Sequence, residues 1–327
     1  MALIKNNFNL PFNIIRCSYG ILGVKDLDAS KKFYTEAIGL IETETTADAA
    51  YLRCLEERQH HSFVLQKSDE AIVYGLGFKV SKEADLDALK KHFKKLNLPT
   101  KWVERYAQGR TLATHTPQGI PLEFYFDMKR EPRMLQKYGL YKGCSPQRFD
   151  HINCFTYDLQ GTYEFFTQEL GFKLTEYSAS EDKDEMLACW MHRKGTVHDM
   201  ALTNGFGPRL HHLAVFVPNA LDIIHLCDVM ATTGYVDNIE RGPGRHGISN
   251  AFFLYVLDPD GHRLEIYTSD YLTVDPDLEP IRWNFLDKQR QTLWGAPAPR
   301  SWFEHGSPFE GVQIQEPYLK NQPIIAK

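Results

Sequence analysis

Two histidines and one glutamate in the second half of the chain have the residue types and spacing of a metal site. His151 stands in FDHINCF, His212 in LHHLAVF and Glu265 in HRLEIYT, and each run has the composition of a strand. Two imidazoles and one carboxylate on one side of a divalent iron or manganese ion leave coordination positions open for a chelating substrate and for O2. We therefore predict one metal centre at which these three side chains meet.

Alternation along each strand defines the face on which the ligands lie. Glu265 shares its face with Arg263 and Tyr267, and His212 shares its face with Ala214. The small alanine leaves room for a ligand beside the histidine. His211 alternates to the opposite face, and we expect it to have a structural role.

The strands that carry these residues belong to an internal repeat. The segment CSYGILGVKDLDASKKFYTEAIGLIETE begins at Cys17, and FDHINCFTYDLQGTYEFFTQELGFKLTEY begins at Phe149. Both predict a strand, an Asp-Leu turn, an amphipathic helix and a new strand. Gly39 and Gly171 stand where the helices end, because glycine adopts the left-handed conformation without a Cβ clash. A second pair of segments, starting at residues 73 and 210, ends in similar hairpins: TPQGIPLEFYF and DPDGHRLEIYT.

This repeat predicts an α+β fold of four βαβββ modules, each about 55–60 residues long. We expect two modules in an N-terminal non-catalytic domain (residues 1–135) and two in a C-terminal catalytic, metal-binding domain (residues 148–270). Each pair should form a partly closed sheet around a cavity. A tail (residues 271–327) holds three of the five tryptophans. Disordered segments are poor in aromatic residues, so we expect the tail to pack against the protein and cover the active site.

The first half lacks the two histidines. The residues that stand opposite His151, His212 and Glu265 in the repeat are Tyr19, Gly75 and Glu123. One half thus folds without these imidazoles, which indicates that the fold does not require them. The alternative interpretation is that strand histidines are core or surface residues, and that the His-His pair arose by chance among 13 histidines.

Composition excludes several classes of protein. The chain of 327 residues suits two domains of ordinary size, and 43% of its residues are hydrophobic. The net charge is −5 with no long basic run, so nucleic acid is not an expected partner. No stretch approaches the roughly 20 apolar residues that span a bilayer, and the N-terminal residues show no signal-peptide core. The six cysteines form no CxxC pair, which predicts reduced thiols and a cytoplasmic location.

The run WMHRKGTVHDMAL and the closing segment IERGPGRHGISNAFFLYVLDPDGHRLEIYTSDY carry a resemblance to a known family. The chain resembles the vicinal-oxygen-chelate superfamily and, within it, the two-domain type I extradiol ring-cleaving dioxygenases. It is most similar to members that cleave homoprotocatechuate (3,4-dihydroxyphenylacetate). The likeness covers nearly the whole chain and is strongest from Phe149 to Tyr271. It implies ring cleavage of a catechol by O2 to a hydroxymuconic semialdehyde, in aromatic catabolism, by a homotetrameric enzyme.

The resemblance also implies roles for individual residues. The ligands would hold Fe(II), or Mn(II) in some members, and His198 in GTVHDMAL matches the acid–base catalyst. Further catalytic residues that line the pocket match Tyr255 and His246. Residues of the substrate site match Asn153, Trp190, Arg241, Arg290 and Trp302, the last three near the substrate's carboxylate. One position departs from the family pattern of two consecutive arginines, because Gln291 follows Arg290.

Other interpretations remain open from the residues themselves. His198 could be a surface histidine in a polar loop, Tyr255 a core tyrosine, His246 a turn residue and Arg241 a solvated side chain. At the level of function, the alternatives are another catechol 2,3-dioxygenase, a glyoxalase-like metal-dependent lyase or isomerase, and a non-enzymatic binding protein of the bleomycin-resistance type. A binding protein would not need two histidines and a carboxylate that converge, nor an acid–base histidine.

Overall fold

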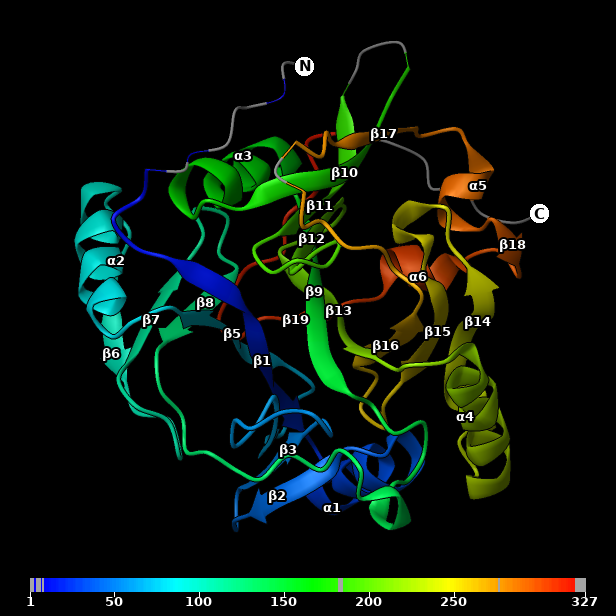
Figure 1. Cartoon of the computed structure of the whole chain (residues 1–327). Helices are drawn as coiled ribbons and strands as arrows, with labels where there is room; N and C mark the ends of the chain where they lie inside the picture. The colour runs from blue at the N-terminus through cyan, green and yellow to red at the C-terminus, as the bar shows by residue number, and fades with distance from the viewer. Residues whose placement is uncertain (1–2, 4–6, 8, 182–184, 276, 321–327) are drawn as a thin grey trace.

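Two β-sheets, one in each half of the chain, form the framework of the protein (Figure 1). The computed structural model describes all residues except 1–2, 4–6, 8, 182–184, 276 and 321–327. The predicted α+β fold with two duplicated halves is confirmed. None of the described helices is long and apolar enough to cross a membrane.

The first sheet has eight strands in the order β2-β3-β4-β1-β5-β8-β7-β6. Its strands are β1 (Ile14–Val24), β2 (Ile41–Thr45), β3 (Ala49–Arg53), β4 (Phe63–Lys67), β5 (Val73–Val80), β6 (Lys101–Val103), β7 (Thr111–His115) and β8 (Pro121–Tyr125). Its helices are α1 (Leu27–Lys32), which widens into the π-helical turn η1 (Phe33–Ile38), and α2 (Ala84–Lys95). A short 3-10 turn, η2 (Tyr138–Leu140), lies between the halves.

The second sheet has eleven strands, of which ten follow the order β17-β10-β11-β12-β9-β13-β16-β15-β14-β18, while β19 pairs with β13. Its strands are β9 (Arg148–Thr156), β10 (Lys173–Ala179), β11 (Met186–His192), β12 (Met200–Asn204), β13 (Arg209–Phe216), β14 (Ile239–Arg245), β15 (Phe252–Leu257), β16 (Arg263–Thr268), β17 (Ile281–Asn284), β18 (Trp294–Gly295) and β19 (Ser307–Pro308). Its helical segments are α3 (Leu159–Glu164), η3 (Phe165–Glu169), α4 (Ala220–Thr233), η4 (Val236–Asn238), η5 (Ile248–Asn250), α5 (Lys288–Gln291) and α6 (Arg300–Glu304).

The two repeats end their first helices in the same way. Asp26 and Asp158 cap the helix N-termini by accepting hydrogen bonds from Ala29 N and Gly161 N. Gly39 (φ +95°) and Gly171 (φ +72°) follow the helices in the left-handed conformation, as the sequence predicted. Both repeats therefore turn from helix to strand at matching places.

The halves are joined through their first strands, β1 and β9, which lie side by side at the centre of the molecule (Figure 1). Cys17 N donates to Asp199 Oδ1 over 2.8 Å, and Cys17 Sγ donates to the carbonyl of Asp150 over 2.8 Å. A continuous apolar core includes side chains of both halves. The strand that carries His151 is therefore held from both sides by buried structure.

The tail extends the second sheet, since it supplies β17, β18 and β19 at three separate places. Trp302 of α6 is buried, Trp283 is half-buried and donates to Glu176 Oε2 over 2.6 Å, and Trp294 is exposed. The backbone of Phe309 also forms a bridge with Val73 of the first sheet. The tail thus packs on the body of the protein at several points.

Candidate metal centre

The side chains of His151, His212 and Glu265 converge on one buried point. The Nε2 atoms of His151 and His212 lie 2.8 and 3.1 Å from Glu265 Oε2, and 3.4 Å from each other. All three ligand atoms lie within 4.8 Å of one another. Elsewhere in the described residues, no other group of three metal-binding side chains comes as close.

Strand register explains this convergence. His151 of β9 pairs with Ala214 of β13, and Ala214 pairs with Glu265 of β16. His212 lies two residues before Ala214, so its side chain projects from the same face of the sheet. Three adjacent strands thus present their ligands around one small residue, as the alternation predicted.

The donor set fits a divalent metal ion. His151 Nδ1 lies 3.1 Å from Asp150 Oδ2 and donates to it, which leaves the lone pair of Nε2 toward the centre. Burial by itself raises the pKa of Glu265, but hydrogen bonds and charges of the two histidines outweigh it and hold the pKa well below its ordinary range. The site therefore offers a carboxylate and imidazole nitrogens, the ligand types that divalent iron and manganese accept.

His211 was expected to alternate to the face opposite His212, and this placement is wrong. Its Nδ1 atom is 2.6 Å from Nδ1 of His212. The pairing of β13 with β9 shifts register between Leu210 and His212, and such an irregularity re-aims side chains that simple alternation would separate. His211 is thus a direct neighbour of a candidate ligand.

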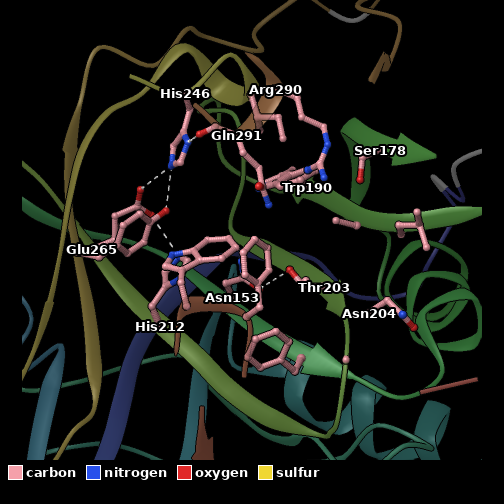
Figure 2. Close-up of a pocket in the computed structure, with 18 of the residues that line it drawn as sticks. Asn153, Ser178, Trp190, Thr203, Asn204, His212, His246, Glu265, Arg290 and Gln291 are labelled. Carbon is pink, nitrogen blue, oxygen red and sulfur yellow. Dashed lines mark hydrogen bonds and ion pairs between the residues drawn. The ribbon is translucent and has the colours of Figure 1, made fainter. Parts of the chain in front are cut away.

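A cavity of about 500 Å³ opens from the candidate metal centre. Of the eleven site residues named from the sequence, ten line it: His151, Asn153, Trp190, His198, His212, His246, Tyr255, Glu265, Arg290 and Trp302. Figure 2 shows His212 and Glu265 at one side of this cavity and Arg290 with Trp190 at another. The volume is ample for a substituted catechol, and the lining joins aromatic rings with a few polar groups, as in small-molecule sites generally.

His198 is buried, so the interpretation of a surface histidine does not hold. It lies in the loop between β11 and β12, and its ring centroid is 3.9 Å from that of His151. Burial lowers the pKa of His198 well below its ordinary value, and the neighbouring His151 lowers it further. The ring is therefore neutral at neutral pH and can accept a proton.

His246 is also buried, directly after the end of β14. Its Nδ1 donates to the carbonyl of Gln291, because a carbonyl can only accept. Its Nε2 therefore carries the lone pair and accepts from the hydroxyl of Tyr255 over 3.1 Å (Figure 2 labels His246 and Gln291). Burial lowers the pKa of His246 to about 3. Together, His246 and Tyr255 form a fixed neutral pair beside Glu265.

Arg241 is the one predicted residue that does not line the cavity. Its side chain is buried behind Trp302, with the guanidinium carbon 4.7 Å from the indole ring centroid. Nη2 donates to the Gln291 carbonyl and to Thr292 Oγ1, whereas Nε and Nη1 have no partner among the described residues. Burial lowers the pKa of Arg241 to about 10, so the group stays cationic at neutral pH. The interpretation of a solvated surface arginine does not hold.

Arg290 places a guanidinium group at the cavity. Its Nε donates to the Phe285 carbonyl over 3.0 Å, and its guanidinium end extends toward Trp190 (Figure 2). The hydroxyl of Ser178 also lines the cavity and has no partner within the described part of the chain. The sequence analysis did not identify Ser178 as a residue of the cavity. The feature that could have indicated it is a polar serine within a strand that is otherwise apolar enough to be buried.

Comparisons with known proteins agree with this geometry. The profile described as Glyoxalase/Bleomycin resistance protein/Dioxygenase superfamily matches residues 15–124 and 148–266. A manganese-dependent 2,3-dihydroxybiphenyl 1,2-dioxygenase of Geobacillus genomosp. 3 is 31% identical over 287 residues, 83% of this chain and 90% of that protein.

Two solved structures are similar over nearly the whole chain. The homoprotocatechuate 2,3-dioxygenase of Arthrobacter globiformis has a TM-score of 0.90 and 40% identity, with 94% of this chain and 97% of that chain covered. The homoprotocatechuate 2,3-dioxygenase of Brevibacterium fuscum, in an anaerobic complex with 3,4-dihydroxyphenylacetate, has a TM-score of 0.90 and 40% identity, with 96% and 99% covered.

The chain therefore belongs to the Glyoxalase/Bleomycin resistance protein/Dioxygenase superfamily. It is an extradiol catechol dioxygenase, and its buried cluster of two histidines and a glutamate suits a divalent metal ion. The predicted enzyme class is confirmed, and a lyase, an isomerase or a non-enzymatic binding protein is not supported.

Proposed function

We propose that the protein cleaves the ring of 3,4-dihydroxyphenylacetate beside its two hydroxyl groups, with Fe(II) held by His151, His212 and Glu265. The observation that carries the proposal is the convergence of these three ligand atoms in the wall of a cavity that also contains a buried arginine, Arg290. The similar structure from Brevibacterium fuscum that holds 3,4-dihydroxyphenylacetate supports the choice of substrate.

The chemistry supplied by a bound divalent ion is the acidification of both catechol hydroxyls and the activation of O2 beside the ring. The protein must then move protons at the substrate. The neutral ring of His198, whose centroid lies 3.9 Å from that of His151, would accept the proton of a catechol hydroxyl and later return a proton to a substrate oxygen. Histidine suits both steps because small changes of environment move its pKa across the working range.

Tyr255 and His246 form the part of the cavity wall beside the metal centre, and their contact fixes the positions of both side chains. The hydroxyl of Tyr255 lies 3.1 Å from His246 Nε2, and it also hydrogen-bonds to Glu265, which helps to raise the pKa of Tyr255. Asn153 belongs to the wall near Thr203, whose hydroxyl donates to Asn153 Oδ1 over 3.3 Å. Trp190 supplies an aromatic surface for the ring of the substrate. These residues orient the catechol and exclude water.

The carboxylate of the side chain would be read by arginines. Arg290 lines the cavity, and Arg241 lies behind Trp302, where its Nε and Nη1 atoms have no partner among the described residues. Guanidinium groups bind carboxylates through charge-assisted hydrogen bonds. Gln291 adds a neutral amide beside them. This chain would therefore bind the carboxylate with one arginine at the position where the family pattern has two consecutive arginines.

The overall reaction balances as one catechol plus one O2, with both oxygen atoms retained in one hydroxymuconic semialdehyde. Iron is our proposal for the metal, and manganese is the alternative that the relative from Geobacillus genomosp. 3 favours. The domain limits 1–135, 148–270 and 271–327, the cytoplasmic location and the homotetramer stay predictions.

The test uses the full chain, made metal-free and reloaded anaerobically with Fe(II) or, in parallel, with Mn(II). We expect that 3,4-dihydroxyphenylacetate and air yield a yellow product with one O2 consumed per molecule of substrate. 4-Methylcatechol, which lacks the carboxylate, should react with a lower kcat/KM. No colour and no O2 uptake with any catechol, from protein with stoichiometric metal, would overturn the proposal. A preference for 4-methylcatechol would overturn the substrate assignment alone.

A further inference from the structure

His211 connects the candidate ligand His212 to the tail of the chain. Its ring is buried and in edge contact with Trp302, at a centroid distance of 4.5 Å. Nε2 of His211 lies 2.9 Å from the backbone carbonyl of Trp302, and Nδ1 lies 2.6 Å from Nδ1 of His212. One imidazole thus bridges α6 and the metal centre.

The two contacts determine where the protons sit. A carbonyl oxygen only accepts, so His211 must donate from Nε2 to Trp302 O. In the neutral ring, Nδ1 of His211 then has a lone pair and accepts from Nδ1–H of His212. This leaves Nε2 of His212 without a proton, on the side that faces Glu265 Oε2 at 3.1 Å. The tail carbonyl therefore selects the form of His212 that binds a metal.

Arg263 anchors the same part of the tail. Its Nη1 donates to the carbonyls of His211 and His305 over 3.0 and 2.9 Å, and Nη2 reaches the carbonyl of Ser301 over 3.3 Å. A buried ion pair with Glu240 holds the guanidinium in place. The backbone of His211 and both ends of α6 are thus fixed by one side chain.

The other histidine ligand has no such link. Nδ1 of His151 donates to Asp150, its neighbour in the same strand. The Nδ1 partner of His151 therefore belongs to β9 itself. The Nδ1 partner of His212 is His211, which is tied to Trp302, 91 residues further along the chain. The two ligands differ in what holds them.

We propose that His211 is a positioning residue that couples docking of α6 to metal binding by His212. The docked tail selects the metal-binding tautomer, and a bound ion strengthens the docking of the tail in return, because such coupling is reciprocal. The inference rests on the proposed function in one respect, that His212 is a metal ligand. It assigns to the tail a role in holding the metal, in addition to forming the wall of the cavity.

The first test compares three variants by titration of metal-free protein with Mn(II) against a competing chelator. His211→Phe keeps a ring of similar size but removes both hydrogen bonds, and we expect its Kd for Mn(II) to rise by about 10- to 100-fold. His211→Gln can accept from His212 and donate to Trp302 O, and should bind within a few-fold of wild type. His225→Phe, on the exposed face of α4, is the control and should not change the Kd.

The second test needs no variant. Hydrogen exchange of a peptide covering residues 300–305 should slow when Mn(II) binds to the wild-type chain, since the amides of Trp302 and His305 belong to the anchored segment. The slowing should be lost in His211→Phe and kept in His211→Gln. A purely structural role would lower the melting temperature of the metal-free variant without changing either readout.

The outcomes separate the two proposals. If wild-type protein binds no metal, the proposed function fails. If it binds Mn(II) but exchange in residues 300–305 does not respond, or if His211→Phe binds as tightly as wild type, the coupling fails while the metal site stands.

Discussion

Tyr19 and His151 occupy equivalent positions in the two halves of the chain. Tyr19 pairs with Gly77 of β5, and His151 pairs with Ala214 of β13. Each of these small residues also pairs with a glutamate on its other side: Glu123 in the first half and Glu265 in the second. The equivalence inferred from the repeat is therefore confirmed by strand register.

The first half balances its glutamate with protein groups. The hydroxyl of Tyr19 donates to Glu123 Oε2 over 2.6 Å, and Arg105 forms an ion pair with the same carboxylate. A Cβ on Gly75 would lie 3.0 Å from Glu123 Oε1, so a larger residue there would crowd the carboxylate. A guanidinium thus supplies the positive charge that we assign to a metal ion in the second half.

This difference predicts opposite effects of substitution at the two sites. His212→Ala should abolish both stoichiometric metal binding and O2 uptake, because it removes one of three ligands. Glu123→Gln should keep the metal and the activity but lower the free energy of unfolding by about 2 kcal/mol, since it weakens a pair that is only partly screened by solvent. Metal analysis and chemical denaturation measure the two effects. Loss of metal from Glu123→Gln would contradict the assignment of a single centre.

His198→Phe should keep the metal and lose turnover. The His198 ring makes no hydrogen bond to another described residue, so a phenyl ring of similar size fits without leaving a buried partner unpaired. General acid–base catalysis contributes about 100- to 10,000-fold to a rate, and we expect kcat to fall within that range. Metal content and kcat for 3,4-dihydroxyphenylacetate are the measurements. A variant with wild-type kcat would end the proposed role of His198.

Arg290→Gln should discriminate between charged and neutral substrates, because Arg290 lines the cavity. Hydrogen bonds to charged groups contribute about 1.5–3 kcal/mol, so kcat/KM for 3,4-dihydroxyphenylacetate should fall by about 10- to 100-fold. The value for 4-methylcatechol should change by only a few-fold. Arg245→Gln, at an arginine outside the cavity lining, is the matched control. Equal losses for both substrates would show that Arg290 supports the fold rather than binding the carboxylate.

Asp270 should contribute more to the stability of the metal-free protein in acid than at neutral pH. Burial and, after it, the negative charge of Asp150 raise the pKa of Asp270 from 3.8 to about 6. A raised pKa in the folded state contributes stability that is complete below about pH 4 and is lost as the pH rises through 6. Asp270→Asn should therefore be more stable than wild type by about 2 kcal/mol at pH 7. The two proteins should converge near pH 4.

Urea denaturation at several pH values, with a chelator present, measures this difference. An equal gain at pH 4 and pH 7 would show that the effect of Asp270→Asn comes from packing and not from ionisation.

The sequence by itself determined the repeat, the two sheets and the three candidate ligands. Strand alternation places His212, Ala214 and Glu265 on one face because the side-chain period of a strand is two, whatever the rest of the chain does. Comparison of the halves then identified the positions at which one half carries imidazoles and the other does not. These features follow from local sequence patterns, which can be recognised without knowledge of long-range contacts.

Only the tertiary structure decided what surrounds the ligands. A register shift in β13 turns His211 toward His212, and docking of α6 brings the carbonyl of Trp302 to its other nitrogen. Burial of His198 and Arg241 likewise depends on loops and tail segments that fold over the sheet. Such contacts join residues far apart in sequence, and no local period specifies them, because they arise from how the tail packs once both sheets have formed.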